Sequence, residues 1–229
     1  LQANNRSGTG VYVVQLAQRL PNLANPDEMV FAWPKDFEVP ADGRQQNAEY
    51  IERGFAGPAA RLRYDQWGIR SDIYTFEADV VHYPANVGSV FPLHNMVLTI
   101  HDMTFFLHPE WYTRERAMYY KWAVARSARN AARIIAVSHA TKNDIIEILK
   151  IPADKIEVVN QGADERFAPA SDDEKETARA KYKLPDRYVL YYGTIEPRKN
   201  LERLIDAWSS IADKIDQHLV IAGRTGWKT

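Results

Sequence analysis

The sequence Tyr188-Val-Leu-Tyr-Tyr-Gly-Thr-Ile-Glu-Pro-Arg-Lys-Asn200 decides how the chain can fold. Its apolar half, which ends at Gly193, indicates a buried strand, and the amphipathic run that follows indicates a helix that the Asn200 side chain can cap. Strand ends of open parallel sheets face a ligand crevice, and the next helix offers unpaired N–H groups and a positive dipole end. The loop therefore predicts an anion site, and the adjacent cations Arg198 and Lys199 suit a diphosphate.

Cations at the start of a helix are electrostatically unfavourable unless an anion joins them. Arg198 can hold two phosphate oxygens with its planar guanidinium and Lys199 adds a point charge, so together they could neutralise a leaving diphosphate without a metal ion. The alternative is a solvated loop with no function. Glu196 in the same loop either approaches the ligand or pairs with Arg198, and Gly193 marks the end of the strand.

The composition excludes several classes of protein. The 29 basic and 30 acidic residues give a net charge of -1, so the totals indicate neither nucleic acid nor an anionic membrane as a partner. The chain has no cysteine, which excludes disulfides and thiolate chemistry. No apolar run approaches the roughly 20 residues that span a bilayer, and no signal peptide is evident, so we expect a cytoplasmic protein. Both ends resemble cut ends, and we expect a fragment of a longer protein.

Apolar runs alternate with helical patterns through the first part of the chain. We expect strands at 29–32, 78–82, 96–100, 133–137 and 156–160, and helices at 113–130 and 139–149, the latter capped by Ser138. The Gly- and Pro-containing segment 34–63 indicates a loop with a helix near its end. This alternation predicts a parallel sheet covered on both faces.

A second sheet is expected to begin near residue 170. The highly charged segment 171–183 connects to a strand-helix-strand unit that runs from 188 to 222. The fold class predicted is therefore α/β, with two doubly wound, Rossmann-like domains on either side of a crevice and only the start of the second domain present.

The glycines of Ser7-Gly8-Thr9-Gly10 precede a helical pattern. A glycine loop before a helix lets the backbone approach a ligand closely, although a flexible end of the chain would look the same. The motif is a poor dinucleotide fingerprint because Val13 occupies the place of the third small residue. We therefore expect no nicotinamide cofactor.

His101 and Asp102 follow the apolar run 96–100, at the predicted mouth of the crevice. His101 could hydrogen-bond a sugar hydroxyl or move a proton, and Asp102 could fix its tautomer or bind a hydroxyl. The alternative is a loop histidine satisfied by backbone groups. The other histidines have no partner at metal-ligand spacing, so no metal site is expected.

Several aromatic side chains occur between residues 111 and 122. They could form a platform for a sugar, but a helix packed on a core explains most of them better. The residues in question are Trp111, Tyr112, Tyr119, Tyr120 and Trp122.

Taken in order, the motifs resemble the retaining nucleotide-sugar glycosyltransferases of family 4, which have the two-domain GT-B fold. The matching blocks are Ser7–Gly10, His82–Asn86, Thr99–Asp102, Ile135–Ser138, Asn160–Asp164 with Phe167, and Tyr192–Asn200. Each block is weak alone, but the ordered set is specific and covers nearly the whole chain except 34–63.

The resemblance implies an acceptor-binding domain at residues 1–165 and the start of a nucleotide-sugar donor domain at 166–229. It implies that Arg198 and Lys199, with Gly193, bind the donor diphosphate, that Gly8 and Gly10 lie near the phosphates, and that His101 approaches the transferred sugar. Asn86 and Glu196 are further candidate substrate contacts. Transfer would retain the anomeric configuration and need no metal and no cofactor besides the donor. The carboxylate pair that the family carries further along the donor domain is not in this sequence.

The leading hypothesis is a transferase that moves a hexose to a glycan or lipid-linked acceptor in bacterial polysaccharide biosynthesis. The resemblance of residues 193–200 to mannosyl transferases favours mannose as the hexose. Lipid-linked acceptors would bring the protein into peripheral contact with the inner membrane face. The alternative is a non-catalytic module that binds nucleotides or glycans on the same fold.

Overall fold

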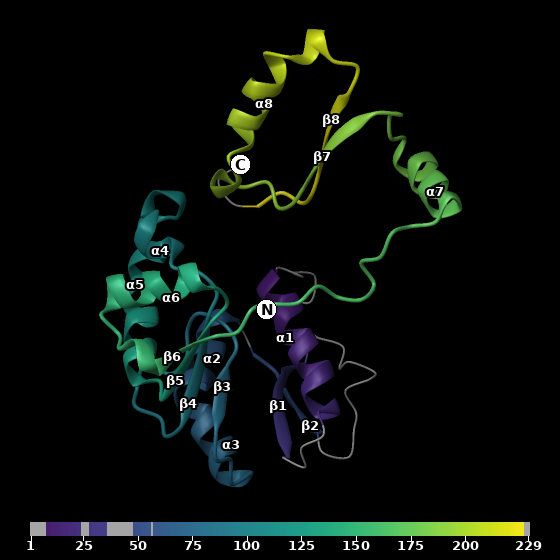
Figure 1. Cartoon of the computed structure of the whole chain (residues 1–229). Coiled ribbons are helices and arrows are strands. Elements are labelled where there is room, and N and C mark those ends of the chain that lie inside the picture. Colours follow the sequence, from purple (N-terminus) through teal and green to yellow (C-terminus); the bar gives the residue numbers. More distant parts are fainter. Residues whose placement is uncertain (1–7, 24–27, 36–47, 56, 227–229) are drawn as a thin grey trace. The chain divides into compact units, whose positions relative to one another are not determined.

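The computed structural model describes residues 8–23, 28–35, 48–55 and 57–226 (Figure 1). The chain divides into two compact units, Leu1–Gln161 and Gly162–Thr229; the sequence placed its boundary after residue 165. Each unit is parallel α/β, as the sequence predicted. The units are described one at a time.

A four-stranded parallel sheet forms the centre of the first unit. Its strands lie in the order β3 (Val81–Tyr83), β4 (Met96–Ile100), β5 (Arg133–Ala136) and β6 (Ile156–Val158). In β4 the side chains of Met96, Leu98 and Ile100 are fully buried, and Leu98 pairs in register with Ile134 of β5. Because all four strands are parallel, their carboxyl ends share one edge of the sheet, where the predicted site residues of this unit follow β3 and β4.

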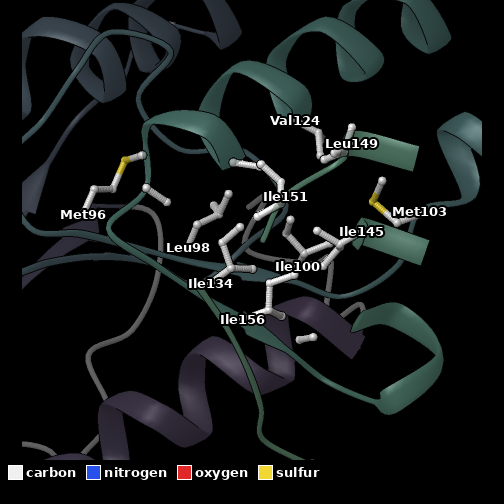
Figure 2. Packing of buried hydrophobic residues seen from close by; sticks show 13 residues of the cluster. Met96, Leu98, Ile100, Met103, Val124, Ile134, Ile145, Leu149, Ile151 and Ile156 are labelled. Carbon is white, nitrogen blue, oxygen red and sulfur yellow. The ribbon is translucent and has the colours of Figure 1, made fainter. Parts of the chain in front are cut away.

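Two helices complete this core (Figure 2). Helix α5 (Arg114–Asn130) buries Val124 against the sheet and α6 (His139–Leu149) buries Ile145 and Leu149. The Ser138 side chain caps α6 by accepting a hydrogen bond of 3.1 Å from the Thr141 backbone N–H, which confirms the predicted cap. Shorter helices lie around them: α4 (Thr104–Leu107), Pro109–Trp111 and Ala153–Lys155.

A smaller parallel sheet consists of β1 (Met29–Pro34) and β2 (Ala48–Arg53). Helix α1 (Gly8–Arg19), which continues as a 3-10 turn (Leu20–Asn22), is linked to this sheet because the Tyr50 hydroxyl donates to the Ala17 carbonyl over 2.9 Å. The sequence predicted β1 but assigned β2 to a loop. The rest of that loop prediction, at 36–47 and 56, lies outside the described residues.

A helical stretch follows β2, and the sequence predicted only the part of it that ends at residue 63. It comprises α2 (Pro58–Arg63), a π-helical turn (Tyr64–Gly68) and α3 (Ile69–Thr75). The Asp72 carboxylate joins α3 to the rest of the unit, because it accepts hydrogen bonds from Arg53 of β2 and from the Tyr64 hydroxyl.

The described part of the second unit contains a β-α-β motif. Strands β7 (Tyr188–Tyr192) and β8 (His218–Ala222) pair in parallel, and α8 (Leu201–Ser209) connects them, with short 3-10 turns at Pro197–Lys199 and Ala212–Lys214. The preceding charged segment is a helix, α7 (Asp172–Tyr182), which the sequence treated as a connection. Its start is fixed by a capping box in which Ser171 and Glu174 exchange hydrogen bonds.

The predicted side-chain cap by Asn200 is wrong. Asn200 precedes α8 but has φ of 54° and ψ of 40°, and its side chain makes no capping hydrogen bond. Asparagine is one of the few residues that adopt this left-handed conformation readily. Asn200 therefore acts through its backbone, by turning the chain from the 3-10 turn into α8.

Candidate functional site

The loop between β7 and α8 holds a buried carboxylate against a cation. The Glu196 side chain is 2% exposed, and its Oε1 accepts a hydrogen bond from Nε of Arg198 at 2.9 Å and forms an ion pair with Nη2 at 2.7 Å. A buried carboxylate needs such a partner, because desolvating an unpaired charge is costly. The sequence left open whether Glu196 approaches a ligand or pairs with Arg198, and the structure shows the pairing. One edge of the guanidinium is thereby fixed in place.

Lys199 differs from its neighbour in that its side chain is exposed and forms no hydrogen bond or ion pair with any residue in the described ranges. It ends the 3-10 turn Pro197–Lys199, directly before α8. The loop therefore presents one cation held by a carboxylate and one that is free to meet an anion.

A second loop at the end of β8 supports the first. The Gly193 N–H donates to the Ala222 carbonyl over 3.0 Å, and the Gly226 N–H donates to the Ile195 carbonyl over 2.8 Å. A Cβ on Gly223 would lie 1.7 Å from the Gly193 carbonyl oxygen, so no larger residue fits there without moving the backbone. Gly193 thus belongs to a loop pair that is locked by backbone contacts at the carboxyl edge of the β7-β8 pair.

His101 in the first unit is held by three neighbours. Its Nε2 lies 2.9 Å from the Pro84 carbonyl oxygen, and its Nδ1 lies 3.2 Å from the amide nitrogen of Gln161. A carbonyl oxygen can only accept, so Nε2 carries the proton and Nδ1 accepts from Gln161. The Tyr12 ring of α1 contacts the imidazole edge-on at a centroid distance of 5.0 Å.

The structure brings Asn86 to His101 but turns Asp102 elsewhere. The Asn86 side-chain oxygen accepts from the His101 backbone N–H over 2.7 Å. Oδ1 of Asp102 instead accepts from the backbone N–H and the hydroxyl of Thr104, at 3.0 and 2.6 Å. The expectation that Asp102 fixes the histidine tautomer is therefore wrong, because the Pro84 carbonyl does so. A catalytic role for Asp102 stays a prediction.

A second histidine, His82, is linked to His101 through Thr99 and Tyr12. Nε2 of His82 is 2.8 Å from the hydroxyl of the fully buried Thr99, which also lies 3.4 Å from the Tyr12 hydroxyl. Burial, followed by the electrostatic effect of the nearby His101 side chain, lowers the pKa of His82 to about 4. His82 is therefore neutral at physiological pH and packs as a polar but uncharged group.

Comparison with known proteins decides the family. Residues 6–167 match the model described as Glycosyltransferase Family 4, and residues 172–229 match that described as Glycosyl transferases group 1. The chain belongs to glycosyltransferase family 4.

Two relatives in Escherichia coli carry names that agree with this family. The chain is 28% identical to O-antigen chain mannosyltransferase B over 169 residues, which cover 72% of this chain and 43% of the relative. It is 31% identical to the serotype-specific mannosyltransferase WbdA over 125 residues, which cover 53% of this chain and 15% of the relative. The chain thus spans less than half the length of these two relatives.

Solved structures show the same fold. Anabaena Alr3699/HepE in complex with UDP superposes with a TM-score of 0.63 at 18% identity, covering 99% of this chain and 60% of that one. The complex of the same protein with UDP-glucose gives a TM-score of 0.59 at 17% identity and covers 96% and 58%. These neighbours are GT-B glycosyltransferases, so the predicted fold class is confirmed, and this family 4 chain covers part of that fold.

The glycines predicted to lie near the phosphates form the first turn of α1. Gly8 is exposed with open space where a Cβ would be, and Gly10 is buried. Ser7, with which the motif begins, lies outside the described residues. Binding roles for Gly8 and Gly10, like those for the other candidate residues of this family 4 chain, stay predictions.

Sequence reasoning missed Gln161, Pro84 and Tyr12 as neighbours of His101. Gln161 was detectable, because it follows β6 at the edge of the sheet where His101 follows β4. Pro84 acts through its carbonyl group, which no side-chain pattern reveals. Within the described residues, no three His, Cys, Asp or Glu side chains gather in a way that could hold a metal ion.

Proposed function

We propose that the protein transfers a hexose, with mannose the favoured sugar, from a nucleotide diphosphate sugar to a glycan or lipid-linked acceptor in polysaccharide biosynthesis. Membership of glycosyltransferase family 4 supports the reaction class, and relatives named as mannosyltransferases support the sugar. The solved HepE complexes with UDP and with UDP-glucose support a nucleotide diphosphate sugar as donor. The observation that carries the proposal is the loop in which Arg198 is held by buried Glu196 beside the unpaired Lys199.

In the proposed reaction, negative charge builds on the diphosphate oxygen as the bond to the sugar breaks. Cations that are in place beforehand stabilise that charge without having to reorganise during the step. Arg198 meets this requirement because Glu196 fixes one edge of its guanidinium, and Lys199 can follow the phosphate as it leaves. We propose that these two cations serve where other transferases use a metal ion.

His101 is proposed to contact the transferred sugar. Its Nδ1 is an acceptor, and in this structure the exposed amide of Gln161 occupies it at 3.2 Å. A sugar hydroxyl that donates to Nδ1 would replace this amide and leave the Nε2 hydrogen bond to Pro84 intact. Retention of the anomeric configuration belongs to the proposal because the family resemblance implies it.

Lys199→Ala tests the proposal most directly, because the side chain is exposed and has no partner to lose among the described residues. An ion pair between a lysine and a phosphate near a protein surface is worth up to about 4 kcal/mol. We therefore expect kcat/KM for transfer to fall about 10- to 100-fold in the complete gene product, with mass spectrometry of the product for a panel of nucleotide diphosphate sugars as the assay.

The matched control is Lys214→Ala, which removes another exposed lysine from the same unit. It should leave transfer unchanged. A wild-type rate in Lys199→Ala would refute the assignment of the diphosphate site. Donor binding by the wild-type protein without transfer or donor hydrolysis would instead favour the non-catalytic module.

A further inference from the structure

A single buried hydroxyl, that of Thr99 in β4, joins three elements of the first unit. Thr99 is fully buried. Its hydroxyl oxygen lies 2.8 Å from Nε2 of His82 in β3 and 3.4 Å from the hydroxyl oxygen of Tyr12 in α1. These contacts tie Tyr12, and with it α1, to the interior of the first unit.

The Thr99 hydroxyl can serve both of its neighbours at once. A hydroxyl has one proton and two lone pairs, so it donates to one neighbour and accepts from the other. Because His82 is neutral at physiological pH, its Nε2 can either accept from Thr99 or donate to it. Buried polar groups with satisfied hydrogen bonds specify one arrangement of the elements that carry them. Thr99 and His82 therefore give the Tyr12 side chain a defined place.

The ring of Tyr12 in turn restrains His101. The planes of the two rings lie at 86° to each other, and their centroids are 5.0 Å apart. This edge-to-face geometry is favourable for two aromatic rings. The Pro84 carbonyl and the Gln161 amide hold the imidazole at its two nitrogens. Tyr12 adds a contact with the ring itself and brings that contact from a helix.

Tyr12 also belongs to the helix whose first turn holds Gly8 and Gly10. Residues four apart lie on the same face of a helix, so Tyr12 shares a face with Gly8. Gly8 has open space where a Cβ would be, and it is a candidate contact for the donor phosphates. One side chain thus sets the separation between the first turn of α1 and His101.

We propose that Tyr12 is a positioning residue, which is held by Thr99 and which holds His101 in a fixed place relative to the first turn of α1. This proposal rests on the proposed function, in which His101 contacts the transferred sugar, and on the predicted place of Gly8 near the phosphates. A small misplacement of groups that orient a substrate lowers the rate of reaction steeply. Loss of Tyr12 should therefore slow transfer more than it weakens donor binding.

Steady-state kinetics of the complete gene product test this role, with kcat and the donor KM measured separately per molecule of folded enzyme. Tyr12→Leu removes the ring and should lower kcat about 10- to 100-fold, with the donor KM changed less than about 3-fold. Tyr12→Phe keeps the ring but loses the contact with Thr99, and it should lower kcat about 2- to 10-fold. A purely structural role of Tyr12 would lower the yield of folded enzyme and leave kcat as it is.

Substitutions of Thr99 test whether the buried hydroxyl carries the effect. Thr99→Val keeps the shape of the side chain but removes the hydroxyl, so it should lower kcat at least as far as Tyr12→Phe does. Adding Tyr12→Phe to Thr99→Val should cause no further loss, because both remove the same contact. Thr99→Ser keeps the hydroxyl and should behave like the wild type. The matched control Tyr74→Phe, which removes the hydroxyl of an 87% exposed tyrosine in α3, should leave kcat unchanged.

A measurement without donor separates this proposal from the proposed function. In NMR spectra of the 229-residue chain at neutral pH, the signals of the His101 ring are assigned by their loss in His101→Ala. These signals should shift in Tyr12→Leu, because the neighbouring aromatic ring no longer shields the imidazole protons. They should shift less in Tyr12→Phe, which retains the ring.

Three results would each overturn the positioning role of Tyr12. They are unchanged His101 signals in Tyr12→Leu, a wild-type kcat in that variant, and losses from Tyr12→Phe and Thr99→Val that multiply in the double variant. In each case, loss of transfer in His101→Ala would leave the proposed function standing. A wild-type rate in His101→Ala would instead refute the sugar contact, and the catalytic role of Tyr12 would fall with it.

Discussion

Replacing Arg198 with alanine would leave the Glu196 carboxylate, which is 2% exposed, without its hydrogen bond from Nε and its ion pair with Nη2. Removing one partner of a buried ion pair costs about 3–5 kcal/mol, because the remaining charge is desolvated and unpaired. The Arg198 side chain is itself 33% exposed, so water can enter the space it leaves. We therefore expect a loss at the lower end of that range, about 3 kcal/mol in the free energy of unfolding of the second unit.

A double-mutant cycle isolates this effect. Glu196→Gln replaces the buried charge by a neutral amide, so adding Arg198→Ala to it leaves no unpaired carboxylate. The remaining cost is that of an unsatisfied buried amide, about 1–3 kcal/mol. The double variant should therefore be more stable than the sum of the two single variants predicts, by about 1–2 kcal/mol.

Urea unfolding of the chain gives these free energies, with hydrogen exchange of peptides from β7 and α8 to report on the second unit. If Arg198→Ala is as stable as the wild type, or if the two substitutions are additive, the pairing of Glu196 with Arg198 is not what holds the loop. If the cycle shows the expected coupling, lost activity in Arg198→Ala alone reports on folding as well as donor binding. Lys199→Ala is then the cleaner test of the diphosphate site.

Two further predictions concern stability. Gly223→Ala should destabilise the chain by about 2–3 kcal/mol in urea unfolding, because its Cβ would lie 1.7 Å from the Gly193 carbonyl oxygen. The control Gly162→Ala, which has open space around it, should be neutral or slightly stabilising. Equal effects of the two substitutions would refute the close approach of Gly223 to Gly193. His82 has a folded-state pKa of about 4, below the 6.5 of the unfolded chain. Its contribution to the free energy of unfolding is therefore complete above pH 6.5 and is lost as the pH falls toward 4. About 2 kcal/mol should be lost between pH 7.5 and pH 5, and this fall should shrink in His82→Gln but persist in the exposed-site control His139→Gln.

Continuous apolar runs allowed most of the fold to be predicted. Strand β4 occupies the predicted residues, and α6 begins after Ser138 and ends at Leu149 as expected. Both elements are recognisable because burial imposes an apolar pattern of the right period, and because a cap residue stands at the start of the helix. Local sequence and tertiary environment agree here, so the sequence alone was sufficient.

The missed elements lack such a pattern. Strand β2 (Ala48–Arg53) carries Glu49 and Glu52 and has no fully buried residue, so its polar sequence resembles a loop. Helix α7 likewise has no buried residue and hence no apolar stripe, although Ser171 and Glu174 at capping-box spacing were a usable signal. Asn200 was misassigned because the same short polar side chain favours both helix caps and left-handed turns.

The candidate site was predictable to the extent that strand ends determine it. That rule placed His101 at the edge of the sheet, the family resemblance added Asn86, and the structure joins the two by a hydrogen bond. It could not show that a backbone carbonyl fixes the imidazole tautomer, or that Asp102 turns toward Thr104. Such contacts depend on the path of the loop backbone. Nearly every residue type carries the same backbone N–H and C=O groups, so the sequence does not reveal these contacts.

The loop after β7 combines a fixed cation with a free one, and this difference suits a leaving group that moves. A fixed cation lowers the cost of developing charge because its position is established before the ligand arrives. Holding Arg198 requires a buried carboxylate, which also cancels part of its charge. A second cation without such a partner restores the net positive charge of the loop, and its flexible stem can follow the diphosphate as the bond lengthens. In the proposed reaction, therefore, Glu196 and Arg198 define where the diphosphate sits, and Lys199 supplies the charge that attracts it.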